Sequence, residues 1–257
     1  MLTSQVIILK LQEGNPMNIL GNHIHGFFFK EILRLSSPSL AADIHNQNTS
    51  KPFSLSFINK EKQIYWIRIT SWLEDISKAV FIYFTIHHTY GLADCAFELI
   101  STTTNKSEFD WADRIPVNEF IKKSKLFGKE DFWLEHFSPT SFKRGDSHLP
   151  LPLPELIINS IYKQLPPEIL NEIRLSPQTL TTCLHLKEYH LQSIYNRKNH
   201  GSITSFIGKT RWQIDKKSTL MEKEAIWLLF NFAFFSGIGV KTTQGMGMCR
   251  IVPGMQS

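Results

Sequence analysis

Cysteine pairs and metal-ligand clusters are scarce in this 257-residue chain. The three cysteines, Cys95, Cys183 and Cys249, lie far apart and form no C-x-x-C pair. This spacing argues against a disulfide framework and against structural zinc. The ten histidines form no H-x-x-x-H repeat with a carboxylate partner. We therefore expect no bound metal and no cofactor.

Long apolar runs are also missing. No stretch reaches the roughly 20 apolar residues that a bilayer-spanning helix needs. The first residues, MLTSQVIILKLQ, show no basic leader and no small-residue cleavage site, so they do not resemble a secretory signal. We expect a folded protein that does not interact with membranes and is located in the cytoplasm.

The positive charge of the chain is unevenly distributed. The formal net charge is +5, yet residues 119–257 carry 18 Lys/Arg against 12 Asp/Glu, and residues 1–118 carry 10 against 11. A basic second half suits a polyanionic partner, because phosphate neutralisation drives nucleic-acid binding. A mild basic excess is common among soluble proteins, so this signal is weak by itself.

The order of predicted elements repeats once along the chain. In the first half, periodicity predicts a strand, helices, two strands, a helix and a strand, near residues 6–11, 20–35, 39–45, 53–58, 64–69, 72–84 and 96–101. The second half predicts strands near residues 132–137, 182–189, 202–214 and 246–252, with helices near 155–165 and 221–235. Ser138-Pro139-Thr140 is predicted to form a turn after the first of these strands. This order predicts an α+β fold of two tandem ferredoxin-like (RRM-like, βαββαβ) domains, 1–118 and 119–257.

The sharpest local motif is a glycine-rich segment between the last helix and the last strand. It comprises Gly237, Gly239, Lys241, Thr242, Thr243, Gly245 and Gly247. Its spacing differs from a P-loop, since Val240 stands where glycine should precede the lysine, and it does not open a helix as a dinucleotide fingerprint does. Two G-x-G pairs around a basic polar centre favour a loop that contacts phosphate through its backbone amides. The alternative is a tight turn whose glycines only permit close packing.

With this loop, the sequence resembles a known family. GIGVKTTQGMG matches, at every glycine, the loop of the repeat-associated mysterious protein (RAMP) superfamily. Ser138-Pro139-Thr140-Ser141-Phe142, the Leu149–Pro152 run and Ser205–Gly208 resemble further family features. Together with the N-terminal block they are similar to the CRISPR-associated endoribonuclease six family, which cuts precursor CRISPR RNA within its repeats.

The resemblance also implies an active site. Ile44-His45-Asn46 matches the family's helix-end histidine, and Lys51 matches a neighbouring basic residue. Some members add a tyrosine from the first helix, where this chain has Phe28-Phe29-Lys30. Lys30 is the candidate for that third role, although His23 and His25 at the start of the same helix also remain open. For His45 the plainer interpretation is a helix-end residue that caps carbonyls or pairs with Asp43.

The implied reaction needs no metal. The ribose 2′-OH attacks the adjacent phosphate and leaves 5′-OH and 2′,3′-cyclic phosphate ends, while an imidazole handles protons. The expected partner is precursor repeat RNA, with Lys143 and Arg144 and the glycine-rich loop as contacts. CRISPR effector-complex proteins and a homodimer are further candidate partners. Two other classes remain open: a non-cleaving RNA-binding RAMP subunit, and a ferredoxin-like enzyme acting on a small molecule.

Overall fold

The computed structural model describes residues 1–46, 50–126, 130–198 and 201–253, with side chains left undescribed at 196–198 and 201–202. The chain divides into two compact units. Unit 1 contains Met1–Pro116 together with Thr243–Gly245. Unit 2 contains Val117–Thr242 and the residues from Met246 onward. The short segment Thr243–Gly245 therefore packs with the first unit, although it lies near the end of the sequence.

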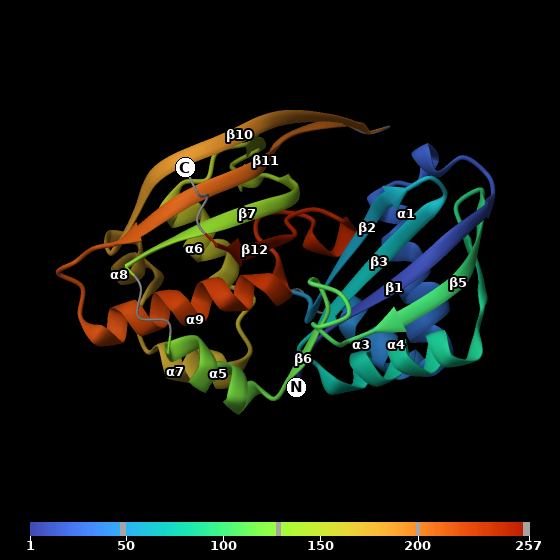
Figure 1. Ribbon diagram of the computed structural model, residues 1–257, viewed down its shortest axis with the longest axis horizontal. Helices are drawn as coiled ribbons and strands as arrows, with labels where there is room; N and C mark the ends of the chain where they lie inside the picture. The colour runs from blue at the N-terminus through green and yellow to red at the C-terminus, as the bar shows by residue number, and fades with distance from the viewer. Residues whose placement is uncertain (47–49, 127–129, 199–200, 254–257) are drawn as a thin grey trace. The chain divides into compact units, whose positions relative to one another are not determined.

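Unit 1 is a sheet with helices against one face (Figure 1). Its strands are β1 (Leu2–Glu13), β2 (Phe53–Glu61), β3 (Ile64–Ser71), β4 (Thr89–Leu92), β5 (Cys95–Thr103) and β6 (Asp113–Ile115). Its helical segments are η1 (Pro16–Asn18), α1 (Gly21–Phe27), η2 (Phe28–Leu33), α2 (Arg34–Ser36), α3 (Pro38–Asn46) and α4 (Glu74–Ile86). The described strands stand in the order β2-β3-β1-β5-β4, with β6 also paired to β1. The pairs β1/β3, β1/β5 and β2/β3 are antiparallel, which is the arrangement of a ferredoxin-like sheet.

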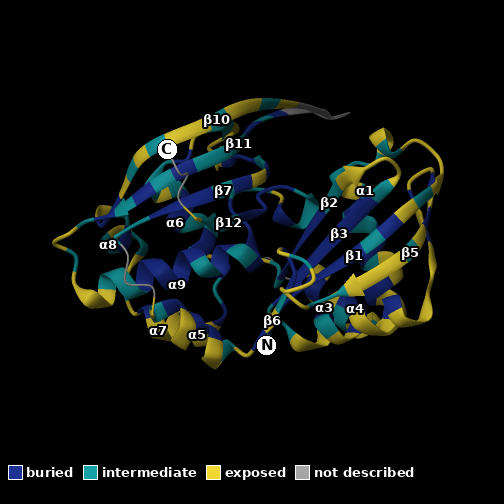
Figure 2. Ribbon diagram, viewed as in Figure 1, coloured by how far each residue is buried: buried dark blue, intermediate teal, exposed yellow. Residues whose placement is uncertain are grey.

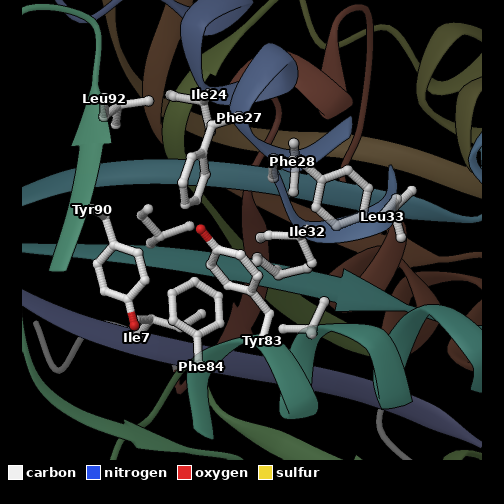
Figure 3. Close-up of a cluster of buried hydrophobic side chains, with 14 of the residues drawn as sticks. Ile7, Ile24, Phe27, Phe28, Ile32, Leu33, Tyr83, Phe84, Tyr90 and Leu92 are labelled. Carbon is white, nitrogen blue, oxygen red and sulfur yellow. The ribbon is translucent and has the colours of Figure 1, made fainter. Parts of the chain in front are cut away.

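The helices of unit 1 are held by an aromatic core. Figure 3 shows Tyr83 and Phe84 of α4 beside Phe27 of α1 and Tyr90 of β4. The rings of Phe27 and Tyr83 meet edge to face with centroids 5.9 Å apart, and those of Phe84 and Tyr90 lie 5.1 Å apart. Ile7 of β1 belongs to the same buried cluster. Burial of such large apolar side chains fixes the α1–η2 segment on the sheet.

Unit 2 repeats the plan, with two strands, β10 and β11, that are longer than any in unit 1. Its strands are β7 (Asp131–Thr140), β8 (Phe142–Arg144), β9 (Ser147–Leu149), β10 (Leu184–Lys198), β11 (Gly201–Ile214) and β12 (Cys249–Val252). Its helical segments are α5 (Val117–Lys125), α6 (Pro154–Tyr162), α7 (Pro167–Ile173), α8 (Pro177–Thr182), α9 (Leu220–Ser236) and η3 (Thr242–Gln244), of which η3 extends into the segment that packs with unit 1. The main sheet has the order β10-β11-β7-β12, and β8 pairs with β9 in a separate hairpin. Because β7, β10, β11 and β12 are the first to fourth strands of this sheet along the chain, the order matches β2-β3-β1-β5 in unit 1.

Helix α9 forms the buried centre of unit 2 and is mostly dark blue in Figure 2. It begins with a capping box in which the Thr219 amide donates to Glu222 at 2.7 Å and the Glu222 amide donates to the Thr219 hydroxyl at 3.3 Å. It ends at Gly237, whose φ of +70° favours glycine. Because the apolar residues of α9 itself occupy nearly all of its faces, hydrophobic periodicity gives little indication of how the helix packs.

One local prediction is wrong. Ser138-Pro139-Thr140 does not turn but continues β7. The Ser138 hydroxyl accepts a hydrogen bond from the Met248 amide at 2.9 Å, and a register shift in the β11 pairing falls beside Thr140. A strand that is irregular at this point tolerates the missing amide of Pro139. The predicted α+β class and tandem ferredoxin-like fold are confirmed.

Within the described ranges, no helix of either unit is long and apolar enough to span a membrane.

Candidate active site

His45 lies in the last turn of α3, a helix that presses one face on the core of unit 1. Ala41 and Ile44 point inward, and Ile44 is only 1% exposed. The adjacent position on a helix turns away by about 100°, so the side chain of His45 is exposed. An exposed imidazole at a helix end is accessible to a substrate, and it is not sealed within the core.

Lys51 is tied to the end of the same helix. Its ammonium donates to the carbonyl oxygen of Ile44 and, at 3.1 Å, to that of His45. The last carbonyls of a helix have no partner within it and carry partial negative charge, so a cation stabilises them. Lys51 therefore holds the main chain of His45 in place and brings a positive charge beside it.

His25 of α1 approaches the same place from a second element. The positive charges of His45 and Lys51 both act on His25, so the three residues lie within electrostatic reach of one another. Burial lowers the pKa of His25 most, its hydrogen bond with the Thr243 carbonyl opposes this, and the two neighbouring cations lower it further. The sequence alone leaves His23 and His25 equivalent. The structure separates them, because His23 Nδ1 accepts from the Leu20 amide at 3.2 Å and caps α1.

An aromatic ring stands between the two imidazoles. Phe29 lies one turn after His25, with ring centroids 4.7 Å apart, and it meets His45 edge to face at 6.0 Å. Phe53 of β2 stacks on His25 at a longer 6.3 Å. The i, i+4 spacing of His25 and Phe29 is readable from the sequence and places both side chains on one face of the helix. This apolar packing restricts the ring orientation of His25.

Lys30 is placed differently from the other predicted residues. It is exposed on η2, where Phe28, Ile32 and Leu33 take the buried positions. Among the residues that the structure describes, no hydrogen bond or ion pair joins Lys30 to His25 or His45. The structure thus brings together His45, Lys51 and His25, and the role of Lys30 stays a prediction.

The glycine-rich segment packs tightly against protein on most of its length. The amide of Gly237 donates to Ala233, that of Gly239 to the Ser160 hydroxyl at 2.7 Å and that of Gly247 to Pro139 at 3.0 Å. A Cβ on Gly239 would lie 2.3 Å from the Ser141 carbonyl oxygen, and one on Gly247 would lie 2.1 Å from that of Ile238. The amides of these three glycines therefore already have protein acceptors, and at Gly239 and Gly247 a side chain would clash with backbone. Close packing explains the glycines at these positions without an RNA contact.

The centre of that segment is more open. Lys241 is exposed with a left-handed φ of +58°, whereas Thr242 is buried. Thr243 and Gly245 are half-buried, and a Cβ on Gly245 would meet only Ile24 of α1, at 3.9 Å. Of the predicted loop contacts, Lys241 has the exposed charge that a phosphate would need.

A cationic group in unit 2 consists of His148 and two predicted RNA contacts, Lys143 and Lys241. Lys143 and Arg144 are exposed on β8. The charges of Lys143 and Lys241 both lower the pKa of His148, although burial is the larger cause. His148 Nδ1 is buried without a hydrogen-bond partner among the described residues. Sequence reasoning misses His148, because β8 and β9 form a hairpin that only the fold makes visible.

Side chains that could bind a metal do not gather anywhere in the described part of the chain. No group of three or more His, Cys, Asp or Glu side chains lies close enough together there to hold a metal ion.

Each of the two units has the strand order of a ferredoxin-like domain, so this chain belongs to the class of tandem ferredoxin-like proteins. Its first unit also carries a helix-end histidine beside a lysine. The family model described as "CRISPR-associated endoribonuclease Cas6" matches residues 134–249. A CRISPR-associated endoribonuclease Cas6 of Streptococcus thermophilus is 24% identical over 246 residues, which cover 92% of this chain and 93% of that protein. The predicted resemblance to the CRISPR-associated endoribonuclease six family is confirmed.

Solved structures share the fold over almost the whole chain. A Cas6 product complex superposes with a TM-score of 0.78 at 23% identity, covering 98% of this chain and 100% of the other. A Thermus thermophilus Cas6 gives a TM-score of 0.72 at 22% identity, covering 98% of each chain. These identities are low, so the likeness concerns the fold.

Proposed function

We propose that this chain is an endoribonuclease that cuts precursor CRISPR RNA within its repeats, without a metal ion, by attack of the ribose 2′-OH. The observation that carries the proposal is the exposed imidazole of His45, held by Lys51 at the end of α3 and accompanied by His25. The Cas6 family model over residues 134–249 supports the same activity. The products would carry 5′-OH and 2′,3′-cyclic phosphate ends.

This reaction asks little of a protein, because RNA supplies its own nucleophile. The 2′-oxygen must be aligned with the leaving 5′-oxygen, one proton must be removed and another supplied. Imidazoles perform both proton transfers near neutral pH. The ammonium of Lys51 stabilises negative charge that develops on the phosphate in the transition state. General acid–base assistance typically contributes about 10²–10⁴-fold, which is sufficient for a processing enzyme of modest turnover.

Substrate binding falls to the basic second unit in this proposal. Lys143, Arg144 and Lys241 present exposed charges, and phosphate contacts supply a large share of the affinity of nucleic-acid-binding proteins. A Cas6 product complex is among the structures that share the fold, which supports an RNA substrate. Precursor repeat RNA is therefore the proposed partner.

The alternative is an RNA-binding RAMP subunit that does not cleave. One experiment separates the two functions: the purified chain is incubated with RNA of the repeat from the CRISPR array in its own genome, in excess EDTA. The nuclease proposal expects two fragments, one ending in a 2′,3′-cyclic phosphate, and no cut in RNA with a 2′-deoxyribose at the cleaved position. Tight binding without any product would overturn the nuclease and support the subunit.

A further inference from the structure

The β8/β9 hairpin places a lysine and a histidine side by side. Its strands pair in an antiparallel register, with Lys143 directly opposite His148 and Arg144 opposite Ser147. Directly opposite residues project from the same face of a hairpin, with Cβ atoms about 4.5–5.5 Å apart, whereas successive residues project from opposite faces. Lys143 and His148 therefore share one face, and Arg144 and Ser147 share the other.

A second lysine reaches His148 from the glycine-rich segment. The charges of Lys143 and Lys241 both act on His148, and all three residues belong to unit 2. The backbone of Lys241 has a left-handed φ of +58°, and its carbonyl accepts from the Met246 amide at 3.3 Å. Among the residues that the structure describes, no carboxylate forms an ion pair with either lysine or with His148, and Asp146 in the hairpin turn is no exception. Basic side chains gathered without a carboxylate are suited to bind an anion.

The two ring nitrogens of His148 differ in their surroundings. Nδ1 is buried and has no hydrogen-bond partner within the described ranges. Nε2 is not buried in this way, and no described residue forms a hydrogen bond with it. A buried N–H without an acceptor is costly, whereas water or a ligand accepts from an exposed one. The single hydrogen of the neutral ring therefore lies on Nε2, which makes this nitrogen a donor open to solvent.

His148 is held in its uncharged form. Burial is the main cause that lowers its pKa, and the charges of Lys241 and Lys143 lower the pKa further. The ring is therefore neutral at neutral pH and contributes a directed N–H instead of a third positive charge. A phosphate oxygen accepts several hydrogen bonds at once, so two ammonium groups and one N–H are compatible partners for one phosphate group.

We propose that His148 binds a phosphodiester of the RNA, with its Nε2–H donating to the same phosphate whose charge Lys143 and Lys241 neutralise. This inference rests on the proposed function in taking RNA as the ligand. It gives His148 a role in binding, and it assigns the two lysines to one phosphate instead of two separate ones. Such a contact fixes the register of the RNA backbone and does not read its bases.

The first test measures the affinity of wild type, His148→Ala, His148→Gln and Ser147→Ala by fluorescence anisotropy. The probe is labelled repeat RNA with a 2′-deoxyribose at the cleaved position. His148→Ala should bind about two- to tenfold more weakly, the usual effect of losing one hydrogen bond. His148→Gln should keep most of the affinity, because its amide also donates. Ser147→Ala, an exposed change on the other face of the hairpin, should bind like wild type. Wild-type affinity in His148→Ala, or an equal loss in both His148 variants, would overturn the proposal.

The salt dependence of binding separates an uncharged donor from a cation. Lys143→Ala should reduce the slope of log K against log salt by about 0.7–0.9, because a counterion is no longer released. His148→Ala should weaken binding at every salt concentration and keep the wild-type slope. A slope reduced as much as in Lys143→Ala would show that His148 binds as a cation, and this would overturn the assignment of an uncharged donor.

Nuclear magnetic resonance of the wild-type chain tests the same donor without relying on a variant that folds poorly. With ¹⁵N-labelled histidine, the His148 ring should show the neutral tautomer with hydrogen on Nε2, and its Nε2 resonance should move when the RNA is added. The resonance that is absent from His148→Gln identifies this ring. Hydrogen on Nδ1, or an Nε2 resonance that does not move at saturating RNA, would contradict the proposal.

These outcomes can be told apart from failure of the nuclease. Cleavage is measured separately, on RNA that has every 2′-OH. If wild type binds this RNA but does not cut it, the nuclease fails and the role of His148 stands. If wild type binds and cuts it and His148→Ala binds equally well, only the role of His148 fails. If wild type does not bind the repeat RNA, both fail.

Discussion

The ammonium of Lys51 lies 3.1 Å from the main-chain carbonyl oxygen of His45. One side chain thus closes the end of α3 and places a positive charge beside the exposed imidazole that the helix presents. In the proposed mechanism this relationship links local stability to catalysis, because loss of the cation would loosen His45, the residue proposed to handle protons. It also explains why a lysine six residues after the histidine can serve the same site.

Replacing Lys51 should therefore affect two measurements at once. Lys51→Met keeps the apolar stem but removes the cation from the helix end, which should lower the free energy of unfolding by about 1 kcal/mol. Single-turnover cleavage should also slow, with only a modest loss of RNA affinity. Chemical denaturation and quenched cleavage assays measure these effects, with Lys62→Met, an exposed lysine between β2 and β3, as the control. An unchanged cleavage rate would remove Lys51 from the site.

His45→Ala should abolish cleavage and leave binding intact. An imidazole contributes proton transfer more than affinity, so the dissociation constant for repeat RNA should stay close to that of wild type. Filter binding and cleavage of the same labelled RNA provide both values. Asp43→Ala, an exposed change on the same helix, should cleave normally. Equal losses in the two variants would instead indicate a general effect on α3.

Two glycines of the loop should respond differently to alanine. Gly245 and Gly247 both have a positive φ, which costs an alanine about 1 kcal/mol. Only Gly247→Ala also forces a Cβ to 2.1 Å from the Ile238 carbonyl oxygen, which should cost roughly 1–3 kcal/mol more. Thermal unfolding of the two variants measures the difference. Larger residues at either position should weaken RNA binding, and retained affinity would show that the loop has no part in it.

The cationic group around His148 should control the salt dependence of binding. Lys143→Ala and Lys241→Ala should each weaken RNA binding and reduce the slope of log K against log salt by about 0.7–0.9 if each contacts one phosphate. Lys106→Ala removes an equal charge from an exposed position in unit 1 and should leave the slope unchanged. Fluorescence anisotropy titrations at several salt concentrations give these slopes. Identical slopes in all three variants would contradict the proposed contacts.

His136 should make the stability of the protein depend on acidity. It is 1% exposed in β7, and burial lowers its pKa to about 3. The unfolded chain binds a proton near pH 6.5 but the folded chain does not, so stability is lost as the pH falls from about 6.5 towards 3, by about 1.4 kcal/mol per pH unit. His136→Gln should remove this component, which denaturation at several pH values can isolate as the difference from wild type. An exposed histidine change such as His88→Gln should leave the dependence unaltered.

Much of the fold could be predicted because the relevant signals are local. Alternating apolar residues indicate β2 and β3, and Pro38 with a helical period indicates α3. The missed elements, such as α7, α8 and the β8/β9 hairpin, are short and depend on packing for their stability. Pro139 shows the same dependence, since a strand accommodates it only where the neighbouring pairing is irregular.

The sequence by itself determined the βαββαβ order and the family resemblance, and that resemblance pointed to His45 and Lys51 as candidate site residues. Only the tertiary structure decided that His25, and not His23, joins them, because Thr243 comes from a segment 218 residues further along the chain. It likewise decided that Lys143 and Lys241 lie within electrostatic reach of His148. Contacts between distant segments depend on how the sheets and helices pack, and no local pattern of residues encodes them.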